Sequence, residues 1–191
     1  MKYNDASKIF LLCLSSLLLM ACAPKADTLT IRHTNDTHSQ VEPIAAGKRD
    51  GNHAGYARRL GVIQQERAAA PNLILVDAGD FCQGTPYFNF YHGRVEIDAM
   101  NRMGYDAITL GNHEFDKKMT GLGEMLSLST VPVVASNYDF SRTDLVGRIR
   151  NSIIIKSGIT KVGFIGLNVM LRNLVDPTAC EGVEWQNAIN V

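Results

Sequence analysis

The sequence lacks the features that mark nucleic-acid-binding, disulfide-rich and membrane-spanning proteins. No histidine follows His113, so residues 114–191 offer no imidazole to a metal ion. The 19 basic and 19 acidic side chains leave no net charge, which gives no case for a scaffold that holds nucleic-acid polymers on a basic surface. Only two of the four cysteines, Cys82 and Cys180, lie beyond residue 22, and two cysteines make no disulfide framework. The apolar stretch of residues 9–20 is shorter than the roughly 20 residues that a membrane-spanning helix needs.

The N-terminus has the pattern of an export signal. Two lysines stand in residues 1–8, the apolar stretch follows, and the small residue Ala21 precedes Cys22. The segment Leu19-Met20-Ala21-Cys22 resembles the lipobox of bacterial lipoproteins, which implies cleavage before Cys22 and acylation of its thiol. We therefore predict a protein anchored by lipid in the cell envelope, at the outer membrane or the periplasmic face. The predicted organisation is a lipoprotein signal peptide over residues 1–21, a tether over residues 22–27 and one domain over residues 28–191.

Two cysteines remain in the predicted domain. Cys82 and Cys180 could form one disulfide in an oxidising compartment, or both could be free buried thiols. The sequence leaves these two alternatives open.

The domain alternates between strand and helix patterns, which is typical of an α/β fold. Alternating apolar residues predict a strand that ends near Thr34, and the continuous apolar run of residues 73–76 favours a strand buried on both faces. Residues 39–55 have the composition of a loop, and the tail from Asp176 to Val191 has no closing strand. Helices are predicted at residues 56–69, 94–103 and 121–128, further strands at residues 107–110 and 131–135, and a hairpin from residues 153–155 and 162–167.

Metal-binding residue types follow three of the predicted strands. They lie in Asn35-Asp36-Thr37-His38, Gly79-Asp80 and Gly111-Asn112-His113-Glu114. Ligands of open α/β sheets bind beyond the carboxyl ends of the strands, where all three motifs lie. If the first motif is extended, Asp36 and His38 project the same way and reach one ion. Mixed nitrogen and oxygen ligands suit Zn²⁺, Mn²⁺ or a similar divalent ion.

Each motif taken alone has an ordinary explanation. Asp36 and His38 match a common surface pair, and Gly79-Asp80 matches an ordinary turn. Asn112 is a suitable cap for the first turn of a helix. The three motifs in this order, each after a strand, instead indicate a site for two metal ions that hydrolyses phosphate esters.

Longer segments around these motifs resemble a known family. They are His33-Thr34-Asn35-Asp36-Thr37-His38, Asp77-Ala78-Gly79-Asp80 and Gly111-Asn112-His113-Glu114-Phe115-Asp116. They are similar to the calcineurin-like metallophosphoesterases, and more narrowly to the 5′-nucleotidase branch, over about residues 28–185. The resemblance implies a layered α/β metallophosphoesterase sandwich, with mixed sheets and flanking helices, that is incomplete at its C-terminus.

The resemblance also implies the role of each site residue. Asp36 and His38 would bind the first of two divalent metal ions, Asp80 would bridge the two ions, and Asn112 would bind the second ion. His113 would stabilise the phosphoryl transition state, with its imidazole oriented by Asp116. A metal-bound hydroxide would attack a nucleotide substrate, whereas Glu114 and Phe115 would be structural.

The chain departs from the family pattern in one respect. The family supplies further histidines C-terminal to these motifs, in a Gly-His-x-His segment that residues 114–191 do not contain. His53 and His92 are interpreted as a solvated loop residue and a helix-start residue. We therefore expect a catalytic domain that lacks a C-terminal segment and a substrate domain. The alternatives are a non-catalytic lipoprotein remnant without a full dinuclear site, and a cyclic-nucleotide phosphodiesterase of the same family.

Overall fold

The computed structural model describes residues 28–191. The predicted signal peptide, the lipidation site at Cys22 and the tether lie outside the described residues. No helix among the described residues is both long enough and apolar enough to span a bilayer.

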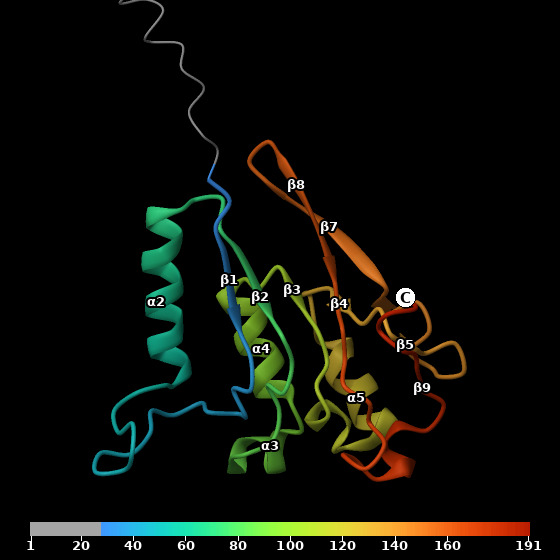
Figure 1. Ribbon diagram of the computed structural model, residues 1–191. Helices are drawn as coiled ribbons and strands as arrows, with labels where there is room; N and C mark the ends of the chain where they lie inside the picture. Colours follow the sequence, from blue (N-terminus) through green and yellow to red (C-terminus); the bar gives the residue numbers. More distant parts are fainter. Residues whose placement is uncertain (1–27) are drawn as a thin grey trace, which may run out of the picture.

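A five-stranded sheet in the order β1-β2-β3-β4-β6 forms the centre of the domain, and every neighbouring pair of strands in it is parallel (Figure 1). Parallel neighbours need crossover connections, which explains why helices alternate with strands along the chain. The predicted α/β class is therefore confirmed. The strands are β1 (Ile31–Thr34), β2 (Ile74–Asp77), β3 (Ala107–Ile108), β4 (Val133–Val134) and β6 (Ile149–Arg150).

Within residues 28–191, four α-helices and two short 3₁₀ helices accompany the sheet. The helices predicted at residues 56–69 and 94–103 form with those bounds, whereas the one predicted at residues 121–128 begins three residues earlier. Helix α3 was not predicted, because six residues are too few to show a helical period. The helices are α2 (Tyr56–Ala69), α3 (Pro86–Tyr91), α4 (Arg94–Met103), α5 (Lys118–Ser127), η1 (His113–Phe115) and η2 (Pro177–Cys180).

The main hydrophobic core lies between one face of the sheet and the helices. Successive strand residues point to opposite faces, so only alternate residues of β2, β3 and β4 enter this core. Burial of these apolar side chains is the main force that holds the helices on the sheet. The core includes Leu75, Ile108 and Val133 from the strands, and Ile97, Met100, Leu122 and Met125 from the helices.

A hairpin covers the other face of the sheet. Strands β7 (Ser152–Ser157) and β8 (Thr160–Ile165) pair in antiparallel fashion, as predicted, but they form a separate two-stranded sheet. Their side chains pack on the strand residues that point away from the helices, which explains why β2 is apolar on both faces. This second, smaller core contains Val76, Ala107, Val134, Ile153, Ile155 and Phe164.

The C-terminal tail does form a strand, so the expectation that it would not was wrong. Strand β9 (Glu184–Trp185) pairs in antiparallel fashion with β5 (Tyr138–Asp139). The indole of Trp185 donates a 3.2 Å hydrogen bond to the carbonyl of Asn168. Such a short strand depends on partners distant in the sequence, and its own residues show no period.

The two cysteines in the described residues are free. Cys82 is buried beside Met125 in the main core, and burial raises the pKa of its thiol well above the ordinary value. Of the two alternatives that the sequence left open, the structure shows free thiols.

Candidate metal centre

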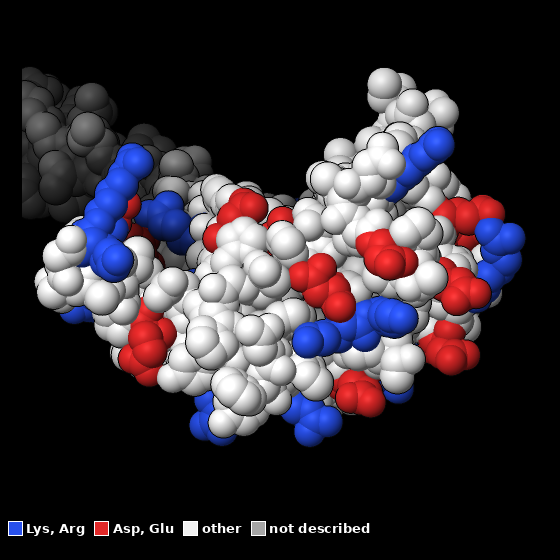
Figure 2. All heavy atoms as spheres, turned by 90° about the horizontal axis from the view of Figure 1, so that it is seen from below, with Lys and Arg blue, Asp and Glu red and all other residues white. Residues whose placement is uncertain are grey.

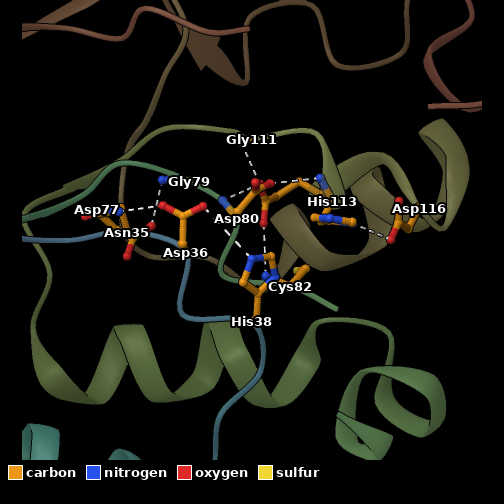
Figure 3. Close-up of polar contacts among 11 residues, drawn as sticks. Asn35, Asp36, His38, Asp77, Gly79, Asp80, Cys82, Gly111, His113 and Asp116 are labelled. Atoms are coloured by element: carbon orange, nitrogen blue, oxygen red, sulfur yellow. Dashed lines mark hydrogen bonds and ion pairs between the residues drawn. The ribbon is translucent and has the colours of Figure 1, made fainter. Parts of the chain in front are cut away.

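Three potential metal ligands meet in the loops that follow β1 and β2. Asp36 and His38 come from the first loop and Asp80 from the second, and one ligand atom from each lies within 4.8 Å of the others (Figure 3). The Nε2 atom of His38 lies 4.0 Å from Oδ1 of Asp36. The structure therefore brings together Asp36, His38 and Asp80 from two different loops at the carboxyl edge of the sheet.

The backbone geometry that brings these residues together differs from the prediction. Asp36, His38 and Asp80 have φ angles of 50°, 43° and 54°, so the expected extended segment after β1 was wrong. Left-handed conformations of this kind cost about 1–3 kcal/mol each and persist where the surrounding structure enforces them. Here the two loops are joined by backbone hydrogen bonds from Asp36 to Gly79, at 2.9 Å, and from His38 to Asp80, at 3.1 Å.

Two glycines allow the loop after β2 to lie close to the loop after β3. Gly79 has a φ of 96°, and a Cβ atom there would lie 2.5 Å from the backbone nitrogen of Gly111. A Cβ atom on Gly111 would in turn overlap the carboxylate of Asp80. Both motifs therefore need glycine for close contact between the loops, and Gly79 also adopts a backbone conformation that favours glycine.

Glu114 links the loop after β2 to the loop after β3 through hydrogen bonds. Its carboxylate accepts backbone hydrogen bonds from Asp80 at 3.0 Å, Cys82 at 3.0 Å and Gly111 at 2.6 Å. The side chain is 2% exposed, and burial raises the pKa of its carboxyl to about 7. The sequence pointed to a structural role for this residue, and the contacts show what that role is.

Asp77 fixes the ends of β1 and β2. Its carboxylate accepts hydrogen bonds from the Thr34 hydroxyl at 2.5 Å and from the backbone of Gly79 at 2.9 Å. The Thr34 hydroxyl also lies 2.8 Å from the hydroxyl of Tyr105. Burial raises the pKa of the Asp77 carboxyl to about 6, against the lowering effect of its two hydrogen bonds.

Asp77 should make the stability of the metal-free protein depend on pH. Its folded-state pKa of about 6 is above the ordinary value of 3.8, so its contribution to stability is complete below pH 3.8 and is lost as pH rises through 6. The difference in unfolding free energy between wild type and Asp77→Asn should therefore fall by about 2–3 kcal/mol over this window. Urea unfolding with EDTA present measures it, and a difference that does not change between about pH 4 and pH 6.5 would contradict the prediction.

His113 and Asp116 lie beside the three clustered ligands. Nδ1 of His113 is 2.9 Å from Oδ2 of Asp116, and the His113 ring lies edge-to-face with His38 at a centroid distance of 5.2 Å (Figure 3). The backbone N–H of His113 also donates a 3.0 Å hydrogen bond to Oδ1 of Asp80. The predicted orienting contact from Asp116 is present, and Nε2 remains available to a ligand.

The structure also defines the places of Asn112, His53 and His92. Asn112 precedes the 3₁₀ helix η1 at its N-cap, but its side chain makes no capping hydrogen bond. His53 is exposed in the loop before α2. His92 ends α3 in a left-handed conformation, so its interpretation as a helix-start residue was wrong.

The clustered residues fit a divalent metal ion. Two carboxylates and one imidazole form the mixed oxygen and nitrogen donor set that Zn²⁺ and Mn²⁺ accept. Oδ1 of Asp80 already accepts the His113 N–H, and among the described residues no hydrogen bond reaches its Oδ2. Asp36, His38 and Asp80 would therefore hold the ion, whereas the presence of a second ion stays a prediction.

The face at the carboxyl ends of the strands carries both signs of charge. Figure 2 shows acidic and basic side chains interspersed on the surface seen from below. A mixed surface of this kind provides little long-range attraction for a substrate of either sign, so recognition depends on local contacts.

Comparison with known proteins identifies the same family as the three motifs. The model of a family described as calcineurin-like phosphoesterase matches residues 29–187. Snake venom 5′-nucleotidase of Naja atra is 42% identical over 146 residues, which cover 72% of this chain and 28% of that protein. The probable 5′-nucleotidase of Treponema pallidum (strain Nichols) is 36% identical over 153 residues, or 76% of this chain and 26% of that protein.

A solved structure matches as well. The 5′-nucleotidase precursor from Thermus thermophilus superposes with a TM-score of 0.76 and 36% identity, over 85% of this chain and 32% of that one. The chain therefore spans less than a third of the length of the relatives described here. The three motifs lie within the residues that the family model matches.

Proposed function

The chain belongs to the calcineurin-like phosphoesterase family, and on that premise we propose that the protein hydrolyses phosphate esters of nucleotides with the help of divalent metal ions. The family predicted from the motifs is thus confirmed. The nucleotide substrate is supported by relatives named 5′-nucleotidases, of which this chain covers only part.

One observation carries this proposal: Asp36, His38 and Asp80 converge within 4.8 Å, with His113 beside them. A divalent ion bound there would polarise the phosphoryl group and provide a nucleophile at neutral pH. The carboxylates of Asp36 and Asp80 would hold the positively charged ion, and Glu114 keeps the loop of Asp80 in place. His113, oriented by Asp116, donates a hydrogen bond from Nε2 to a phosphoryl oxygen as negative charge develops.

We further propose two ions, with Asp80 between them and Asn112 on the second. The lipid anchor at Cys22 belongs to the same proposal and places the enzyme at the cell envelope. Fatty-acid labelling that is lost on Cys22→Ala would support the anchor, and labelling that persists would remove it.

His113→Ala provides the direct test of function. The variant should reduce hydrolysis of AMP by the full chain in Mn²⁺ or Zn²⁺ about 100-fold, because it removes a group that stabilises developing charge. It should leave binding of the ion nearly unchanged, since the proposed ligands are other residues. His53→Ala, in an exposed loop, is the matched control and should keep full activity.

The same assay separates the alternatives. Uptake of metal without turnover of any nucleotide would indicate a non-catalytic remnant, and turnover of cyclic nucleotides in preference to AMP would indicate a phosphodiesterase. Turnover that His113→Ala does not reduce would remove His113 from the proposed mechanism.

A further inference from the structure

A chain of side-chain hydrogen bonds runs from Tyr105 to the loop after β2. Tyr105 lies between α4 and β3 and is 5% exposed, with its ring in the main hydrophobic core. Its hydroxyl lies 2.8 Å from the hydroxyl of Thr34, which donates a 2.5 Å hydrogen bond to Oδ2 of Asp77. The other oxygen of that carboxylate accepts the backbone N–H of Gly79 at 2.9 Å. Three polar side chains therefore join the connection between α4 and β3 to the turn that precedes Asp80.

The donors along these side chains all point toward Asp77. A hydroxyl group has one proton to donate, and the proton of Thr34 is directed to the Asp77 carboxylate. The contact between the two hydroxyls therefore has Tyr105 as its donor and Thr34 as its acceptor. Hydrogen bonds in such a series polarise and strengthen one another. Loss of the Tyr105 hydroxyl should therefore weaken the contacts farther along the series.

The far end of the series reaches the metal-ligand loops. The backbone N–H of Asp36 donates a 2.9 Å hydrogen bond to the carbonyl of Gly79, and Asp80 follows Gly79 directly. Asp36 and Asp80 have φ angles of 50° and 54°, which strain residues other than glycine and persist only where neighbouring contacts enforce them. The Asp77 carboxylate provides one such contact, because it fixes the N–H of Gly79.

We propose that Tyr105 is a positioning residue for the metal centre. Its hydroxyl acts through Thr34 and Asp77 to hold the turn at Gly79, and that turn sets the positions of the two carboxylate ligands. The inference rests on the proposed function, because these positions matter only if the cluster binds metal. Hydrogen-bond partners outside the ligands themselves typically tune the affinity of a site for its ion.

Tyr138 offers a matched control. It is 3% exposed, its ring also lies in the main core, and its hydroxyl donates a hydrogen bond to the carbonyl of Val169, which follows β8. Tyr105→Phe and Tyr138→Phe therefore each remove one buried hydroxyl and one hydrogen bond, and both keep the ring. A difference in metal affinity between the two variants reports what the Tyr105 hydroxyl is joined to, because the loss of a buried hydroxyl is common to both.

Metal affinity tests the inference. Titration calorimetry of the full chain with Mn²⁺ alone should show affinity reduced about fivefold to tenfold in Tyr105→Phe, as expected for one hydrogen bond. Tyr138→Phe should bind within about twofold of wild type. Unchanged affinity in Tyr105→Phe, or an equal loss in both variants, would overturn the inference and leave the proposed function standing.

Variants of Thr34 test the route of the effect. Thr34→Val should reduce the affinity for Mn²⁺ about 10-fold to 100-fold, whereas Thr34→Ser, which keeps the hydroxyl, should bind nearly as wild type does. Because Tyr105 acts through Thr34, the double variant of Tyr105→Phe and Thr34→Val should lose no more affinity than Thr34→Val alone. Losses that multiply in the double variant would mean that the two hydroxyls act separately, and would overturn the inference.

Amide hydrogen exchange tests the inference without metal. In the metal-free full chain, the N–H groups of Asp36 and Gly79 should be protected, and they should exchange at least about fivefold faster in Tyr105→Phe but not in Tyr138→Phe. Wild type in which both groups exchange as fast as unprotected amides would overturn the inference, and that measurement needs no variant to fold. Wild type that binds no Mn²⁺ would instead count against the proposed function, and the exchange rates would still decide the role of Tyr105.

Discussion

Asp80→Asn should weaken divalent metal binding at least about 1,000-fold, which corresponds to about 4 kcal/mol. The substitution removes a negative charge from the centre of the cluster and leaves its shape unchanged. Asparagine tolerates the left-handed φ of 54° at this position as well as aspartate does, so backbone strain does not confuse the result. The loss reflects the replacement of a charged carboxylate ligand by a neutral amide, which binds a divalent cation more weakly.

The variant separates the charge of Asp80 from its structural contact. Oδ1 of Asp80 accepts the N–H of His113 at 3.0 Å, and the amide oxygen of asparagine can do the same. Unfolding without metal should therefore change by less than about 1 kcal/mol, whereas the affinity for Mn²⁺ or Zn²⁺ falls. Asp98→Asn, on the exposed face of α4, controls for the charge removed. Calorimetric affinity of Asp80→Asn within about tenfold of wild type would contradict the proposed metal centre.

Glu114→Ala should destabilise the domain by about 4 kcal/mol, because it leaves one buried and two partly buried backbone N–H groups without an acceptor, at about 1–3 kcal/mol each before the loops relax. Glu114→Gln should cost about half as much, since the amide keeps one acceptor oxygen but turns its NH₂ group toward backbone donors. Urea unfolding in EDTA measures both variants. The loops of Asp80 and Gly111 would lose their common attachment in the alanine variant.

A matched control lies on α5. Glu124 is exposed and has only a 3.8 Å contact with Arg94, so Glu124→Ala should change stability by less than about 0.5 kcal/mol. A loss below about 1 kcal/mol for Glu114→Ala would show that the loops find other partners. Metal affinity measured alongside should fall in Glu114→Ala as well, because the backbone N–H of Asp80 then loses its hydrogen bond to Glu114.

The order of elements and the position of the three motifs were predictable from local patterns. Helices over residues 56–69 and 94–103 showed a helical period, and the apolar run of β2 indicated a strand buried on both faces. Each motif followed a predicted strand, so the carboxyl edge of a parallel sheet was the expected place for all three motifs. The hairpin of β7 and β8 was also evident from two apolar runs around Gly158.

The missed elements are short or depend on distant partners. Helix α3 has six residues, and β5 and β9 have two residues each, so none of them shows a period. The pairing of Tyr138 with Trp185 joins residues far apart in the chain, and packing alone brings them together. The local propensity of either segment does not predict such long-range contacts.

The sequence by itself determined the chemistry of this protein: which residue types stand at the ends of the strands, and therefore which family it belongs to and which kind of ligand it suits. Only the tertiary structure decided how those residues meet. The left-handed turns of Asp36, His38 and Asp80, the close contact at Gly111, and the burial of Glu114 all depend on backbone and side chains from separate loops. The left-handed backbone is strained by itself, and the hydrogen bonds between loops that maintain it form only once the sheet has brought the loops together.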